Sequence, residues 1–430
     1  MKLNHILYYL LLIFLPVQLG RHFFPDFALI AGIRSDYLSP TIFLTDLLIL
    51  LMLAVEVIGF LQIKRGLLFT RASKSFTRNS KRWYFFLALL LYLVFTSLFI
   101  AANPQAALYK LLKITEYAYL VSYIIRLKPK LLESILSLSV GVYYSSVVAI
   151  WQFLAQSSIG GLFWWLGERS FNLSTPGIAK TTINGAEMLR PYATFPHPNV
   201  LGGFLAVMLP VILAIMIYHR DVLTGKLYLY LNLTLVLGLF ALVFTFSRTA
   251  WVMGAFGFGL VFLADPKIVV KTARRKIILL SVLYVILLLS VLTPFILPQT
   301  IDSFKERSSF ISTAFEMIRL QPVFGYGLNN FIVNFHEFVP PTAGIYIFQP
   351  LHNMYLLIFL ETGLWGLITA LILFSKLYLR SAKSDYLVFI GVVQLLLLGL
   401  FDHYLVTLQQ GQLLLTVFTS LALTPEHNQV

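Results

Sequence analysis

Long apolar runs separated by short polar segments dominate the hydrophobic pattern of this 430-residue chain. A helix that crosses a membrane needs about 20 consecutive, mostly apolar residues. We therefore expect about twelve membrane helices, near residues 5–19, 41–63, 83–101, 108–125, 131–155, 199–218, 227–246, 250–264, 277–297, 353–374, 387–400 and 405–423. The first run is as short as that of a signal peptide, but no small-x-small cleavage site follows it, so we interpret it as a retained helix.

The composition agrees with an all-α polytopic membrane protein. Hydrophobic residues make up 59% of the chain and charged residues 12%, whereas soluble domains carry about 25% charged residues. A soluble fold has too little interior for so many apolar side chains, so we expect residues 1–430 to form a single membrane domain. The chain contains no cysteine, which excludes disulfides, thiol catalysis and metals bound by cysteine.

The basic residues are divided unevenly between alternate loops. Of the 32 Lys and Arg residues, 21 fall before the first helix or in one set of loops, and nine fall in the other set, which is longer in total. Basic loops stay on the cytoplasmic side of a membrane, so we expect both termini to be cytoplasmic. Two long outer loops follow, about 156–198 and about 298–352, and we expect them to form the active-site face.

The first long outer loop ends in a group of polar side chains. Arg190, His197 and Asn199 lie directly before a predicted helix, which we expect Asn199 to cap. This group is either a stiff, capped helix entry or part of a site. Arg248 stands in a very short outer turn, where it either extends to lipid phosphate or has a function, because an arginine at a membrane edge is costly.

The second long loop carries further candidates. Apolar residues at 310, 311, 314, 315 and 318 predict an amphipathic helix on the membrane surface, with Arg307 near its start. The turn around Gly325 and Gly327 has backbone amides that can bind an anion. His352 and Asn353 end the loop. In a later outer turn, Asp402 precedes His403 and can orient an imidazole.

Three arginines and a histidine on one membrane face indicate a lipid-linked phosphate or pyrophosphate substrate. Arginine makes permanently charged, two-pronged contacts with phosphate oxygens, and a neutral imidazole can take a proton from a hydroxyl. The outer loops contain no Asp-x-Asp pair, so a site without a metal is the simpler interpretation. Within the bundle, we expect Lys113 to pair with Glu116 and Lys110 to face the lipid phosphate.

Taken together, these residues resemble the O-antigen ligase and O-antigen polymerase superfamily. The likeness covers most of the chain and is strongest over 190–366. It rests on the order and spacing of Arg190, Thr194-Phe195-Pro196-His197-Pro198-Asn199, Ser247-Arg248-Thr249, Arg307, Pro322, Gly325, Gly327, Phe331, His352-Asn353, Tyr355, Glu361-Thr362-Gly363 and Gly366. Ile311 stands where the family often has tryptophan, a difference that concerns the acceptor surface more than the chemistry.

The resemblance implies a membrane glycosyltransferase of the GT-C type in the bacterial inner membrane, with its site on the outer face. Such an enzyme uses a glycan on undecaprenyl pyrophosphate, needs neither metal nor other cofactor, and inverts the anomeric carbon. By this likeness Arg190, Arg248 and Arg307 bind the pyrophosphate, and His352 activates the acceptor hydroxyl. The expected supporting residues are His197, Asn199, Gly325, Gly327, Asn353, Asp402 and His403.

Several functions remain open at this point. The acceptor is lipid A core, a glycan repeat or a protein hydroxyl; the last would make the protein an O-oligosaccharyltransferase. A flippase of the same lipid is the alternative from another class, but its basic residues should line a path through the bundle. A peptidoglycan-type polymerase would rely on an outer-loop carboxylate. We expect the lipid bilayer as a partner and no nucleic acid, since the excess of basic residues follows the topology.

Overall fold

The computed structural model describes residues 3–66, 80–263, 299–339 and 349–424, and most of them are helical. The helices are α1 (Leu3–Ile13), α2 (Leu44–Gly66), α3 (Ser80–Phe95), α4 (Pro104–Leu127), α5 (Leu131–Ala155), α6 (Pro198–Tyr218), α7 (Gly225–Phe244), α8 (Arg248–Leu263), α11 (Gln299–Leu320), α12 (Phe331–Phe338), α13 (Met354–Ser381), α14 (Tyr386–Leu398), α15 (Tyr404–Thr407) and α16 (Gln409–Leu423). A π-helical turn at Thr96–Ile100 extends α3.

Most of these helices follow the predicted apolar runs closely. In the described part of the chain, α2, α5, α6, α7 and α13 are long and apolar enough to cross a membrane, and α1, α3, α8 and α14 are shorter apolar helices. An integral membrane protein accounts for them. The total of about twelve spans stays a prediction, and the run expected at 277–297 lies outside the described residues.

Helix α6 forms the centre of the bundle. Of its apolar window, 89% is buried, because α5, α7, α8, α14 and α16 all pack against it. The corresponding buried share is only 22% for α2, 28% for α7 and 33% for α13, and large apolar side chains such as Leu50, Phe240 and Trp365 are exposed there. Apolar side chains on the outside of a helical bundle are those expected to face lipid.

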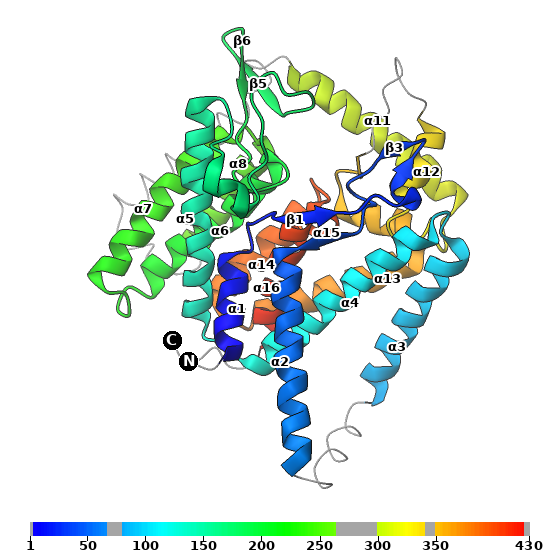
Figure 1. The fold of residues 1–430 in the computed structure, drawn as a ribbon, viewed down its shortest axis with the longest axis horizontal. Coiled ribbons are helices and arrows are strands. Elements are labelled where there is room, and N and C mark those ends of the chain that lie inside the picture. The colour runs from blue at the N-terminus through cyan, green and yellow to red at the C-terminus, as the bar shows by residue number, and fades with distance from the viewer. Residues whose placement is uncertain (1–2, 67–79, 264–298, 340–348, 425–430) are drawn as a thin grey trace.

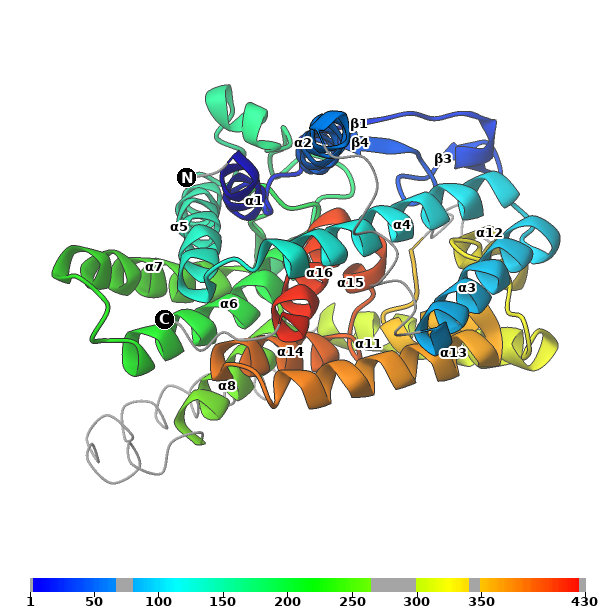
Figure 2. The same cartoon turned by 90° about the horizontal axis from the view of Figure 1, so that it is seen from below.

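Helices from distant parts of the sequence enclose the bundle interior. Figure 2 shows α14 and α16 between the group α5–α8 and the group α3, α4 and α13. Helix α16 packs against α4, α13 and α14, so the end of the chain contacts its first third. This packing brings the turn before α15 beside the N-terminal half of the molecule.

Short antiparallel strand pairs order the segments between helices. Strand β1 (Gly20–His22) pairs with β4 (Thr41–Phe43), and β2 (Leu29–Ile30) pairs with β3 (Ile33–Arg34), with a single 3-10 turn at Asp26–Ala28 before β2. We call residues 20–43 the N-terminal hairpin segment. In the loop after α5, β5 (Lys180–Ile183) pairs with β6 (Ala186–Leu189). In Figure 1, β3, β5 and β6 lie with α11 and α12 in the upper part of the molecule, and β1 lies nearer its middle.

Several helix boundaries differ from the sequence-based expectation, such as the end of α13 at Ser381 rather than near 374, and two of the differences change the course of the chain. The helix predicted at 5–19 ends at Ile13, because Pro16 has no amide hydrogen with which to continue the helical hydrogen bonds. The run predicted as one helix over 405–423 is broken at Leu408, whose backbone is extended (φ −112°, ψ 140°). This break separates α15 from α16 and turns polar residues at the start of α16 towards the bundle interior.

The amphipathic helix predicted in the second long loop is present as α11, but its apolar residues do not form a single face towards the membrane. Phe310, Ala314 and Met317 are buried against α12 and α13, where the Phe310 ring lies 4.8 Å from that of Phe335. Ile311 and Phe315 are exposed on the other side. The helix therefore packs onto the protein and also presents apolar side chains outwards.

Candidate functional site

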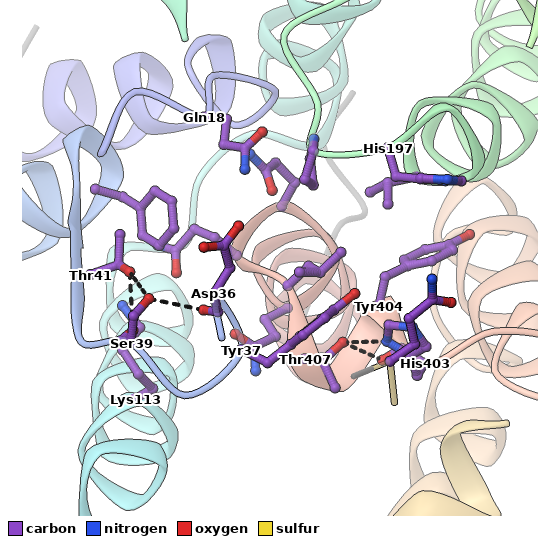
Figure 3. A pocket seen from close by; sticks show the side chains of 18 of the residues that line it. Gln18, Asp36, Tyr37, Ser39, Thr41, Lys113, His197, His403, Tyr404 and Thr407 are labelled. Carbon is purple, nitrogen blue, oxygen red and sulfur yellow. Dashed lines mark hydrogen bonds between the residues drawn. The ribbon is translucent and has the colours of Figure 1, made fainter. Parts of the chain in front are cut away.

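A polar cavity of about 260 Å³ lies where the N-terminal hairpin segment, α4, the first long loop and the segment around α15 meet. Its walls carry imidazoles, carboxylates, amines, carboxamides and hydroxyls. Figure 3 shows Thr41, Ser39 and Lys113 at one side of this cavity and His197, Tyr404 and His403 at the other. No other part of the described chain brings so many of the predicted site residues together.

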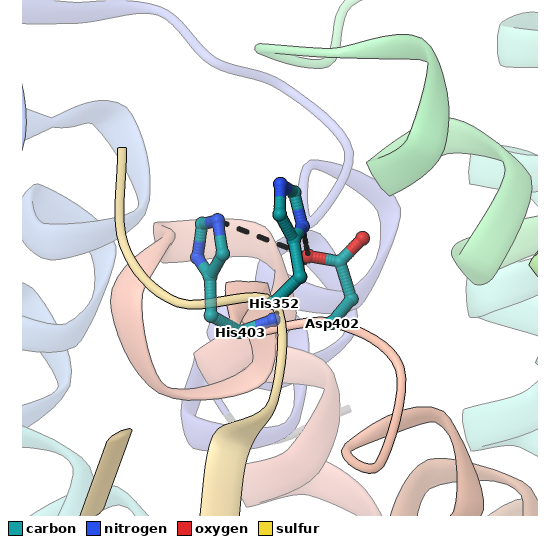
Figure 4. A group of neighbouring side chains, drawn as sticks. All are labelled: His352, Asp402 and His403. Atoms are coloured by element: carbon teal, nitrogen blue, oxygen red, sulfur yellow. Dashed lines mark hydrogen bonds and ion pairs between the residues drawn. The ribbon is translucent and has the colours of Figure 1, made fainter. Parts of the chain in front are cut away.

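His352, Asp402 and His403 form a compact cluster on the cavity wall (Figure 4). Nδ1 of His352 lies 3.3 Å from Oδ1 of Asp402, and Nε2 of His403 lies 3.8 Å from the same oxygen. The two imidazole rings are 5.2 Å apart. The prediction that Asp402 can orient an imidazole therefore agrees with the geometry, although the imidazole closest to it is that of His352.

The start of α13 holds His352 in place. Asn353 caps this helix, since its side-chain oxygen accepts hydrogen bonds from the amides of Tyr355 and Leu356. Its side-chain nitrogen donates to the carbonyl of Leu400 (3.0 Å), and the amide of Met354 donates to the carbonyl of Gly399. Asn353 thus fastens the segment that carries His352 to the turn that carries Asp402.

The carboxylate of Asp402 stays ionised at this position. Burial raises the pKa of the Asp402 carboxyl, but the hydrogen bond with His352 and the neighbouring imidazoles outweigh it and hold the pKa well below its usual range. Oδ1 also accepts a hydrogen bond from the amide of His403 (2.8 Å). A fixed negative charge beside Nδ1 of His352 favours a proton on that nitrogen, which leaves Nε2 as the acceptor.

His403 is held more tightly than His352. Its side chain is buried, its Nδ1 lies 2.6 Å from the hydroxyl of Thr407, and the ring of Tyr37 meets it edge-on at 5.8 Å. Little of this ring is open to a ligand, whereas the His352 side chain is 20% exposed. His352 is therefore the better placed of the two to contact a substrate.

The cluster also has the donor set of a possible metal site. One ligand atom from each of His352, Asp402 and His403 lies within 4.8 Å of the others, and two imidazoles with a carboxylate suit zinc or a similar transition metal. The oxygen of Asp402 that faces the imidazoles is the one engaged by the His403 amide. This cluster is where a metal would bind if one is involved.

His197, rather than Asn199, caps α6. The helix begins at Pro198, and Nδ1 of His197 accepts a hydrogen bond from the Asn199 amide (3.1 Å). The expectation that Asn199 is the cap is therefore wrong, because the proline at 198 shifts the helix start by one residue. Burial, followed by the charge of Arg190, lowers the pKa of His197 to about 3, so this ring stays neutral.

Arg190 lies at one corner of the site, next to the cavity rather than on its wall. Nη2 of Arg190 donates to Oδ1 of Asn199 (2.7 Å), and Nε donates to the carbonyl of Thr245 (2.8 Å). Thr245 is three residues before Arg248, which begins α8. Arg307 belongs to α11, and its side chain is outside the described residues.

The turn at Gly325 and Gly327 does not offer free amides to an anion. Its amides donate to the backbone of neighbouring segments, that of Gly325 to the carbonyl of Gln321 and that of Gly327 to the carbonyl of Glu361 (2.9 Å). The turn packs against α13 where Gly363, with φ +63°, interrupts the helix. This interruption leaves carbonyl groups of α13 available to accept hydrogen bonds from the turn. These glycines therefore permit close backbone packing, and the anion-binding interpretation of the turn is wrong.

A buried charge network lies below the cavity. The ammonium group of Lys113 contacts Asp46 at 2.8 Å and Glu116 at 2.7 Å, which confirms the predicted Lys113–Glu116 pair and adds Asp46. Lys110 lines the cavity and donates to the carbonyl of Val406. Buried ions need such partners to offset the loss of hydration, so the network fixes α2 against α4.

The pattern of the sequence missed several cavity residues. Asp36, Tyr37 and His22 come from the N-terminal hairpin segment, which was interpreted only as a short outer loop. Arg169 comes from the middle of the first long loop, and Gln410 from the polar start of α16. The available indication was a group of three glutamines inside an otherwise apolar run, at Gln409, Gln410 and Gln412.

Residues 233–371 match the family model described as O-antigen ligase. This part of the chain is therefore similar to a family of membrane enzymes that transfer glycosyl groups. The matched range contains Arg248, Arg307, Gly325, Gly327 and His352, whereas Arg190, His197, Asp402 and His403 lie outside it. No curated protein gives a significant match to the chain.

Proposed function

Taking the O-antigen ligase match as the premise, we propose that this protein transfers a glycan from undecaprenyl pyrophosphate to an acceptor hydroxyl on the outer face of the bacterial inner membrane. One observation carries this proposal. His352, inside the matched range, lines a polar cavity with Nδ1 placed 3.3 Å from the ionised carboxylate of Asp402. A histidine oriented in this way is a general base for a hydroxyl group.

The reaction is a direct displacement at the anomeric carbon of the donor glycan. The acceptor oxygen forms the new bond to this carbon while the bond to the pyrophosphate oxygen breaks, so the configuration inverts. Nε2 of His352 takes the hydroxyl proton, and undecaprenyl pyrophosphate leaves with the electron pair. Asp402 stabilises the imidazolium that forms, because its negative charge is fixed next to Nδ1.

The arginines act on the leaving group. We assign Arg190, Arg248 and Arg307 to the pyrophosphate, as guanidinium groups neutralise its growing charge and hold its oxygens through paired hydrogen bonds. The position of Arg190 supports this assignment. Its contacts with Asn199 and with the carbonyl of Thr245 hold the guanidinium between the start of α6 and the start of α8. Arg248 begins α8 itself.

The acceptor enters from the opposite side of the cavity in this mechanism. In-line displacement requires the attacking hydroxyl to approach the anomeric carbon on the face away from the pyrophosphate. The wall formed by the N-terminal hairpin segment and the start of α16 carries the groups Asp36, Ser39, Thr41, Gln409 and Gln410, which both donate and accept hydrogen bonds. Such a wall is suited to hydroxyl-bearing acceptors, and lipid A core and a glycan repeat both fall within this class.

The experiment compares purified wild-type protein with His352→Ala in detergent, in the presence of EDTA. The donor is a glycan on undecaprenyl pyrophosphate, and lipid A core, free glycan repeats and a serine-containing peptide serve as acceptors. The readouts are glycan transferred and undecaprenyl pyrophosphate released. His219→Ala is the matched control, because His219 also lies beside a carboxylate, 4.0 Å from Asp385, but away from the cavity.

We expect wild type and His219→Ala to transfer glycan with EDTA present and His352→Ala to be inactive, with all three proteins equally folded. The acceptor that receives the glycan then separates ligase, polymerase and protein O-oligosaccharyltransferase. Activity that disappears with EDTA and returns with zinc would replace the metal-free mechanism with one that uses His352, Asp402 and His403 as ligands. Movement of the lipid across liposomes without any release would favour a flippase instead.

A further inference from the structure

Arg169 is the one arginine among the described residues that line the cavity. It comes from the first long loop and is exposed. Its guanidinium carbon lies 5.9 Å from the centre of the Tyr192 ring, and no carboxylate in the described part of the chain forms an ion pair with it. The centre of the His197 imidazole lies 6.0 Å from the centre of the same Tyr192 ring. Arg169 and His197 therefore flank the same aromatic ring.

The other cations on the cavity wall are already engaged. Lys113 is held between Asp46 and Glu116, and Lys110 donates to a backbone carbonyl. An incoming anion would compete with these partners for either ammonium group, and displacing the partners of a buried ion would cost several kcal/mol. Arg169 carries no such cost, since its side chain is exposed and forms no ion pair in the described part of the chain.

The backbone before Arg169 is fixed by two features. Glu168 is buried, and its carboxylate accepts hydrogen bonds from the amides of Ile159 (2.7 Å) and Gly160 (2.8 Å) and from the side chain of Gln152 (2.8 Å). Gly167 has φ +82°, and a Cβ there would lie 2.4 Å from the backbone nitrogen of Leu19. This packing sets the position of the guanidinium at the cavity mouth before any ligand binds.

An aromatic turn precedes these residues. The 3-10 turn η3 (Gly161–Leu166) exposes 82% of Leu162, 51% of Trp164 and 63% of Trp165, and the two indole rings pack edge to face at 4.9 Å. Tryptophan is enriched where hydrocarbon meets the headgroups of a bilayer. Arg169 follows the last residue of this turn by three positions, so a turn that lies in this layer would hold Arg169 at the depth of lipid phosphate groups.

We infer that Arg169 binds the pyrophosphate of the lipid-linked donor at the cavity mouth, and that η3 lies in the bilayer interface against the polyprenyl chain. This inference rests on the proposed function and adds a fourth arginine and a lipid contact to it. Arg169 contacts the donor as it enters, while Arg190 and Arg248 hold the pyrophosphate as the leaving group. The chemistry recognised is a dianionic or more highly charged phosphate on a long isoprenoid chain.

The test measures kcat and KM for the donor in nanodiscs for Arg169→Gln, Arg169→Lys and the double variant Trp164→Ala/Trp165→Ala. Arg34→Gln is the matched control, because Arg34 is also exposed on an outer segment, lies 5.2 Å from the Phe24 ring and does not line the cavity. A donor with the natural long polyprenyl chain is compared with one carrying a short, water-soluble chain. Elution on gel filtration checks that each variant is folded.

We expect Arg169→Gln to raise the donor KM at least about tenfold for both donors with little change in kcat, the effect of losing a charge-assisted contact worth about 1.4 kcal/mol. Arg169→Lys should give a smaller rise, and Arg34→Gln none. The double tryptophan variant should raise KM for the long-chain donor alone. These three results together support both parts of the inference.

An unchanged donor KM in a folded Arg169→Gln protein would overturn the assignment, as would a fall in kcat without a rise in KM. A KM effect that changes with the phosphatidylglycerol content of the nanodiscs and vanishes without it would also overturn it, because Arg169 would then bind ordinary phospholipid. Failure of the proposed function looks different: the wild-type protein itself would release no undecaprenyl pyrophosphate with any acceptor.

Discussion

Replacement of Asp402 by asparagine separates its electrostatic role from its structural one. The change removes one negative charge and keeps the shape of the side chain. Asparagine retains an oxygen that can accept the hydrogen bond from the His403 amide, now 2.8 Å long. The turn before α15 should therefore remain folded, and the effect should fall on the imidazole of His352.

The magnitude follows from the separation of the two charges. Nδ1 of His352 and Oδ1 of Asp402 are 3.3 Å apart, and their side chains are 20% and 9% exposed. At an effective dielectric constant of about 20, a pair of unit charges at this distance gains roughly 5 kcal/mol. Solvent reaches His352, so we expect about half of this energy in the transition state, which corresponds to a fall in kcat of roughly 100-fold.

The assay is a single-turnover measurement of undecaprenyl pyrophosphate released by Asp402→Asn at saturating donor and acceptor. Asp385→Asn is the control, because Asp385 faces His219 in a comparable pair and caps α14 through the Leu387 amide, a bond that asparagine also makes. We expect the control to retain wild-type activity. A rate within roughly threefold of wild type for Asp402→Asn would refute the argument that this carboxylate stabilises the imidazolium.

Three further outcomes are expected. Arg190→Lys should lower kcat by roughly tenfold in the glycan transfer assay although the charge is kept, because an ammonium cannot reproduce the guanidinium contact with Thr245 and a second partner at once; full activity would contradict the role of its geometry. His197 has its pKa lowered to about 3, so the fold loses stability as pH falls below about 6.5, by up to about 2 kcal/mol at pH 5, and thermal unfolding of His197→Asn, which keeps a capping side chain, should lack this dependence. Gly327→Ala should destabilise the protein by roughly 2 kcal/mol or more, measured as a lower unfolding temperature, because the added Cβ would lie 2.5 Å from that of Ala101 at a positive φ; an unchanged unfolding temperature would mean that the turn moves freely.

The helices could be predicted because the apolar residues that form a membrane span are consecutive in the sequence. A run such as 131–155 is apolar along its whole length, and α5 begins and ends at these same residues. The wrong ends at Ile13 and at Leu408 depend on how the chain turns back onto the bundle. The predicted cap of α6 was two residues away from the observed one, since both His197 and Asn199 have side chains able to cap a helix.

The site residues were only partly predictable. His352 and Asp402 could be named from their places at helix ends on one membrane face, but 50 residues separate them, and a contact over this separation has no local pattern. The glycine turn could be named as a turn, whereas its partner, the interrupted α13 near Gly363, is a feature of packing. Arg169 gave no indication in the sequence beyond its charge.

The sequence by itself determined the class of the protein, the positions of most helices and the uneven distribution of basic residues, because hydrophobicity and charge act residue by residue on the partition between lipid and water. Only the tertiary structure decided which polar groups meet. It placed Asp402 against His352, Lys113 against Asp46, and Arg169 on the wall of the cavity, because the packing of the helices and loops brings segments distant in the sequence within a few ångströms of one another.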